Sequence, residues 1–119
     1  MKVTRLGYVT LLVVLVFLLA PVHGKGKQIP VAAETASYTI TIENFQFSPH
    51  NLEIPDGSKV IWINKDEEPH KVAEINNAFA SPVLDTDQTF SYEFKSTGKF
   101  EYFCTIHPHM TGTVTVNPK

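Results

Sequence analysis

The residues of this chain that could do chemistry are concentrated near its C-terminus. Cys104, His107 and Met110 follow one another at intervals of three residues, and Gly112 ends the short stretch that holds them. A thiolate, an imidazole and a thioether are soft to borderline donors, which suit copper better than calcium or magnesium. The spacing therefore predicts a loop that binds a copper ion.

A trigonal copper site of two His and one Cys, with a weak axial Met, needs a second His from elsewhere in the chain. His70 is the best candidate, because it opens the segment after the apolar strand that contains Trp62. The loop after that strand can lie at the same end of an antiparallel sandwich as the Cys-His-Met loop. His50 is a weaker candidate, since its turn is expected at another corner, and His23 belongs to the N-terminal signal or its edge.

Each donor also has an ordinary structural interpretation. Cys104 is the only cysteine of the chain, and a free Cys is usually a small buried hydrophobe. Met110 could pack in the core, and His107 alone would be a surface residue. Exported proteins usually employ Cys in disulfide pairs, so a lone thiol that shares a short loop with His and Met favours the metal. His109 is expected to lie exposed beside the site.

Short runs of alternating apolar and polar residues follow residue 37, and such alternation indicates half-buried strands. The runs cover residues 38–42, 45–47, 52–54, 60–63, 70–75, 90–94, 100–104 and 112–116. Residues 55–57 predict a turn, residues 96–98 predict a hairpin, and residues 76–87 predict an irregular connection that could hold one helical turn. About seven to eight strands with frequent turns predict an all-β Greek-key sandwich.

Residues 1–24 predict an export signal, expected to be helical. Lys2 and Arg5 precede an apolar run from about Tyr8 to Ala20, which is typical of such signals. Cleavage could follow residue 24 or residue 33. The run is shorter than the roughly 20 residues of a membrane span, yet an uncleaved anchor is the alternative. Residues 25–37 are expected to form a flexible tether and residues 38–119 the folded domain, exported to the periplasm or outside the cell.

The charge of the predicted mature chain excludes one class of partner. Without residues 1–24, twelve acidic side chains remain against eight basic ones, for a formal charge of −4. Nucleic-acid binding needs clusters of Lys and Arg, and the sequence contains none. Four protein donors on a single metal leave no open position for a substrate, so an enzyme is not expected.

The chain resembles the cupredoxins, the type 1 blue copper proteins, and among them the amicyanins and short plastocyanin-like proteins. The resemblance covers about residues 38–118 and rests on two segments, residues 62–70 and residues 104–110. It implies an eight-stranded Greek-key sandwich that binds one Cu(I)/Cu(II) ion. His70, Cys104 and His107 would be equatorial ligands and Met110 the axial one.

The resemblance has two further implications for the site. Asn64 stands where the family keeps an Asn that ties the two ligand loops together by hydrogen bonds. His109 is a departure, because amicyanin-like loops often carry an apolar aromatic residue at that position. This departure affects the expected docking surface and removes no ligand.

The resemblance implies a carrier that passes single electrons between redox partners. The electron would leave through the exposed edge of His107, and Ile106, Pro108 and Met110 would surround that edge with an apolar surface for brief docking. We expect a monomer with no membrane contact beyond an N-terminal anchor. A copper storage or delivery protein is the main alternative, although the sequence lacks the Met-rich or His-rich tracts that would favour it. A metal-free adhesion module is the third.

Overall fold

The computed structural model describes residues 19–21 and 23–119. Residues 1–18 and 22 of the predicted signal, residues 1–24, fall outside the described residues. Residues 19–21 and 23–36 have exposed side chains and no regular secondary structure. Ala32–Lys119 form one folded unit. No helix in the described part of the chain is long and apolar enough to cross a bilayer.

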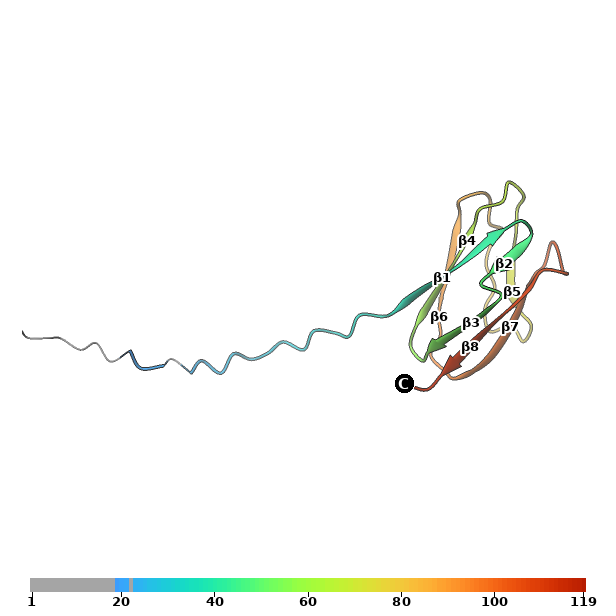
Figure 1. Cartoon of the computed structure of the whole chain (residues 1–119). Helices are drawn as coiled ribbons and strands as arrows, with labels where there is room; N and C mark the ends of the chain where they lie inside the picture. Colours follow the sequence, from blue (N-terminus) through green and yellow to red (C-terminus); the bar gives the residue numbers. More distant parts are fainter. Residues whose placement is uncertain (1–18, 22) are drawn as a thin grey trace, which may run out of the picture. The chain divides into compact units, whose positions relative to one another are not determined.

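Eight strands make up the folded unit (Figure 1). They are β1 (Ser37–Glu43), β2 (Gln46–Ser48), β3 (Asn51–Pro55), β4 (Lys59–Asn64), β5 (Val72–Glu74), β6 (Thr89–Glu93), β7 (Gly98–Cys104) and β8 (Thr111–Asn117). Four strands form one sheet in the order β2-β1-β4-β6, and four form the other in the order β3-β8-β7-β5. The pairs β1–β4 and β3–β8 are parallel and the remaining pairs are antiparallel. The all-β prediction is confirmed.

The predicted hairpin at residues 96–98 is wrong. The turn exists, but β6 pairs with β4 in one sheet, whereas β7 pairs with β5 and β8 in the other. The connection therefore crosses from one sheet to the other. Alternation indicates which face of a strand is buried, and both sheets bury their faces in the same core, so the pattern does not reveal the partner strand.

Two other expectations differ in detail from the structure. Phe45 lies in the turn between β1 and β2 and not in a strand, and both Asn44 and Phe45 have a positive φ, of 53° and 55°. The connection over residues 76–87 is irregular, as expected, and contains no helical turn.

Apolar side chains from both sheets form one buried core, which makes the structure a β-sandwich. At its centre, Trp62 of β4 is fully buried. Its ring lies 5.3–5.6 Å from those of Phe79, Phe90 and Tyr102. Trp62 is therefore a core residue, and the same core extends to Cys104 and Met110, which are 0% and 2% exposed.

Tyr102 of β7 provides a pH-dependent test of this core. Burial raises the pKa of its hydroxyl, and the nearby Trp62 side chain offsets only part of that increase. Above about pH 10 the unfolded chain loses this proton while the folded chain keeps it, so stability should fall by about 1.4 kcal/mol per pH unit. In urea unfolding of the copper-free protein, the free energy of unfolding of Tyr102→Phe should fall less steeply above about pH 10 than that of the wild type. Equal slopes for the two proteins would contradict the assignment.

Candidate metal centre

Three of the four predicted donors meet at one end of the sandwich. The Nδ1 atom of His70 lies 3.7 Å from Sγ of Cys104, and Nδ1 of His107 lies 3.8 Å from the same sulfur. The two Nδ1 atoms are 3.3 Å apart. His70 and Cys104 are buried and His107 is half-buried. The three atoms thus form a small triangle that is largely shielded from water.

The size of this triangle fits a metal ion at its centre. With bond lengths of about 2.0–2.1 Å to imidazole and about 2.3 Å to thiolate, as at zinc, trigonal ligands lie roughly 3.6 Å (N to N) and roughly 3.8 Å (N to S) apart. The observed separations of 3.3, 3.7 and 3.8 Å are close to these values. A thiolate and two imidazoles suit copper, so the residues present fit the ion that the sequence predicts.

Backbone hydrogen bonds bring the segment after His70 to Cys104. Val72 of β5 stands opposite Cys104 of β7 in the antiparallel register. The Lys71 N–H points to Sγ of Cys104 at 3.4 Å, and the Lys71 carbonyl accepts from the N–H of Thr105 at 2.9 Å. Lys71 therefore connects the two donor segments. Sequence reasoning missed it because its backbone, and not its side chain, makes both contacts.

The loop after Cys104 closes on itself. The Cys104 N–H donates to the Met110 carbonyl at 3.0 Å, and the Met110 N–H donates to the His107 carbonyl at 2.9 Å. These bonds hold the backbone of Met110 beside that of Cys104, and the Met110 side chain is only 2% exposed. The thioether is thus shielded from water, while its role as axial ligand remains a prediction.

His70 is fixed by both its backbone and its ring. Its backbone exchanges two hydrogen bonds with Leu84, of 3.1 and 2.7 Å. Its Nε2 lies 2.8 Å from a carboxylate oxygen of Asp66. When Nε2–H donates to a carboxylate, the tautomer is set and Nδ1 presents its lone pair to a metal. The ring is thus oriented for coordination.

Asp66 is a functional residue that sequence analysis missed, since the acidic run 66–68 resembles an ordinary solvated surface. Its carboxylate also accepts the N–H groups of Asn44 at 2.6 Å and Phe45 at 3.0 Å. Burial alone would raise the pKa of Asp66, but these two hydrogen bonds and the contact with His70 outweigh it, so the pKa lies below 3.8. The only hint in the sequence is the four-residue spacing to His70.

Asn64 has a narrower role than the family resemblance implied. Its amide donates to the carbonyls of Glu68 at 2.8 Å and Leu84 at 2.9 Å, and its side-chain oxygen accepts the Asp66 N–H at 2.9 Å. Among the described residues, none of its hydrogen bonds reaches residues 104–110. Asn64 therefore shapes the segment that carries His70, and the tie between the two ligand loops is made at Lys71 instead.

Replacing Asn64 with Ala should destabilise the domain by about 2–3 kcal/mol, because buried carbonyls lose their donor. The free energy of urea unfolding of the copper-free protein measures this change. Asn51→Ala, at an exposed position, is the control and should change stability little. A loss at Asn64 no larger than that at Asn51 would contradict the proposed role of these hydrogen bonds.

The other histidines lie outside the donor triangle. His50 and His109 are exposed and line a cavity of about 320 Å³ together with Phe45 and Met110. The His109 ring lies 6.4 Å from that of His107, in agreement with its expected position beside the site. His23 lies in the separate N-terminal unit.

Comparisons with known proteins agree with this geometry. Residues 8–116 match the family model of the cupredoxin-like domain. Amicyanin-alpha of Methylorubrum extorquens is 33% identical over an 89-residue alignment that covers 71% of this chain and 75% of that protein. Amicyanin of Paracoccus denitrificans is 32% identical over a 92-residue alignment that covers 71% of this chain and 70% of that protein.

Solved structures show the same fold. A purple cupredoxin from Nitrosopumilus maritimus superposes with a TM-score of 0.63 at 35% identity, covering 66% of this chain and 98% of that one. A copper-containing nitrite reductase from Thermus scotoductus gives 0.67 at 28% identity, covering 72% of this chain but 23% of that one. The chain belongs to the cupredoxin family and is similar to amicyanins, with His70, Cys104 and His107 close together as its candidate copper site.

Proposed function

We propose that the chain binds one copper ion through His70, Cys104, His107 and Met110 and carries one electron at a time between redox partners. The observation that carries this proposal is the triangle of donor atoms, with sides of 3.3–3.8 Å. When bound, the copper ion would accept or release one electron by changing between Cu(II) and Cu(I). The similarity to amicyanins supports the same conclusion.

The chain's own contribution is to keep the donors still. Cys104 is held by the β5–β7 register and by the Lys71 N–H, and His70 by Leu84 and Asp66. These contacts are made by the protein and do not require the ion. Outer-shell hydrogen bonds of this kind orient ligands and tune a metal. A site that moves little between oxidation states favours rapid electron transfer, so these contacts support the proposed carrier role.

The remaining parts of the proposal concern location and domain limits. We infer that residues 1–24 direct export to the periplasm or cell exterior, that residues 25–37 tether the domain, and that residues 38–119 act as a monomer. Support comes from the basic and apolar start of the sequence and from the exposed residues 23–36. Pulse labelling of expressed protein, with mass measurement of the exported product, tests the cleavage site directly.

The test of the proposed function is an optical and spin-resonance spectrum of the copper-loaded chain, followed by a redox titration. We expect intense thiolate-to-Cu(II) absorption with one copper per chain, and reversible reduction without loss of metal. Copper that passes readily to a chelator on reduction would favour delivery or storage. A colourless protein with added copper would reject both functions.

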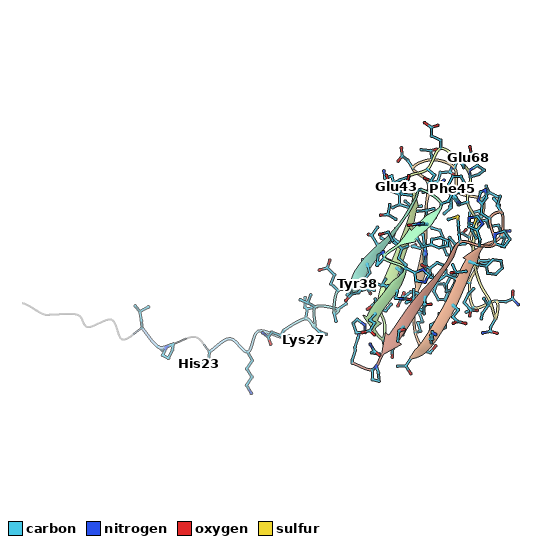
Figure 2. All side chains as sticks on the ribbon, turned by 45° about the vertical axis from the view of Figure 1, so that its right-hand side comes forward. His23, Lys27, Tyr38, Glu43, Phe45 and Glu68 are labelled. Atoms are coloured by element: carbon cyan, nitrogen blue, oxygen red, sulfur yellow. The ribbon has the colours of Figure 1, made fainter. Side chains whose placement is uncertain are left out.

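Docking is proposed at the surface beside His107. Ile106 is 43% exposed and Phe45 is 40% exposed, so both apolar side chains are accessible to a partner. Figure 2 shows Phe45 at the same end of the sandwich as Glu43 and Glu68. A small apolar surface with a half-buried imidazole suits the brief contacts of redox partners, which bury little area.

Replacing Ile106 with Glu should slow electron transfer to a partner while the optical spectrum stays the same, because a charge now enters the docking surface. Thr97→Glu is the control, since it adds the same charge at an exposed position before β7, at the other end of that strand from Cys104. The self-exchange rate of the copper protein, measured by NMR line broadening at fixed ionic strength, reports the effect without a known partner. Equal rates for the two variants would refute docking beside His107.

A further inference from the structure

Phe45 covers both imidazoles of the candidate site. Its ring makes edge-to-face contacts with His70 at a centroid distance of 5.5 Å and with His107 at 5.0 Å. The outer part of the side chain is exposed, so one aromatic ring stands between the two donor rings and the solvent. Trp62, by contrast, lies in the core.

A single carboxylate fixes this ring and one of the imidazoles together. Phe45 follows Asn44 in a turn where both have positive φ, a conformation that is rare for a bulky residue such as Phe. The two oxygens of Asp66 accept the N–H groups of these residues, and one of them also contacts Nε2 of His70. The turn that carries Phe45 is therefore tied to the segment that carries His70.

A cavity that does not include the donor imidazoles also lies against Phe45. Its volume is about 320 Å³, and Gln46, His50, His109 and Met110 line it together with Phe45. Such a space is large enough for several waters or a small anion. Because Phe45 both lines the cavity and packs on the imidazoles, its ring forms part of the wall between them, beside the Met110 side chain.

We propose that Phe45, held in place by Asp66, closes the metal site to water and small anions, so that the protein donors alone surround the ion. This role rests on the proposed copper site and goes beyond docking. Phe45 is a positioning residue, since it acts on the site through the two imidazoles. Without the ring, the cavity would open toward the donor triangle.

Phe45→Ala tests this role in the copper-loaded chain. Alanine keeps a Cβ at positive φ, so the backbone strain is the same in both proteins. Added azide should produce a new charge-transfer band and a changed spin-resonance spectrum with Phe45→Ala, and neither change with the wild type. Bicinchoninate should remove Cu(I) about tenfold faster or more from the variant, as for other outer-shell losses.

Ile106→Ala is the matched control, because it removes a similarly exposed apolar side chain from the same end of the sandwich. Phe45→Tyr keeps the ring and should resist azide like the wild type. If Phe45→Ala excludes azide and retains Cu(I) like the wild type, or if Ile106→Ala opens the site equally, the proposal is wrong. Should Phe45→Ala fail to fold, Phe45→Leu provides the same comparison. A wild type that never becomes blue would instead reject the copper site itself.

Discussion

Replacing Cys104 with Ser will abolish the intense visible absorption of the copper-loaded protein. The colour depends on charge transfer from a thiolate, and a serine hydroxyl supplies no thiolate. The structure makes Cys104 the common neighbour of both imidazole nitrogens, at 3.7 and 3.8 Å. We also expect copper affinity to fall by at least about 100-fold, beyond the 10–100-fold typical of outer-shell changes. Optical titration with copper measures both effects.

The control for this prediction separates ligands from neighbouring residues. His109→Ala removes an exposed imidazole two residues from His107 and should keep the colour. Copper-free Cys104→Ser should unfold near the wild-type urea concentration, because the hydroxyl is similar in size and polar groups of Lys71, His70 and His107 face the buried position. If Cys104→Ser were blue, or if His109→Ala were colourless, the copper ligands would differ from those proposed here.

The spacing of Cys104, His107 and Met110 was enough to predict that these residues share one loop, because they lie within a stretch of seven residues. His70 was harder, since its proximity depends on the β5–β7 pairing. Placing it after an apolar strand in a sandwich was enough to bring it to the correct end. The strands themselves were predictable from alternation, which follows from burial of one face.

Other features could not be read from the sequence, for physical reasons. Alternation does not specify a partner strand, so the 96–98 connection was assigned to a hairpin. Lys71 acts through its backbone, which every residue has. Asp66 looks like its acidic neighbours until its hydrogen bonds to Asn44 and Phe45 are seen. Each of these depends on a long-range contact.

Gly112 lies between the aromatic core and the ligand loop, and it has no room for a side chain. It stands opposite Tyr102 in the β7–β8 register and lies two residues after Met110. A Cβ at Gly112 would clash with the Tyr102 hydroxyl and with the ring carbon that bears it. Tyr102 is 1% exposed and packs against Phe47 and Trp62, so its ring has nowhere to move.

Replacing Gly112 with Ala should therefore cost about 3 kcal/mol or more, at the upper end for overpacked cores. That is a large part of the 5–15 kcal/mol typical of a domain. Urea unfolding of the copper-free protein measures the loss, and the copper-loaded spectrum should shift because β7 and β8 flank the ligand loop.

A second substitution, in Tyr102, can show whether the tyrosine ring causes the loss of stability in Gly112→Ala. If crowding against the ring is responsible, adding Gly112→Ala to a Tyr102→Val protein should cost little more than Tyr102→Val alone. Gly98→Ala is the control, since Gly98 has a φ of 140° and only one distant neighbour at 4.0 Å. The loss of stability in Gly98→Ala should come from backbone strain, so it should be the same in the wild type and in the Tyr102→Val protein. A Gly112→Ala penalty that also persists without the tyrosine ring would mean that the backbone, and not the aromatic core, requires glycine beside the ligand loop.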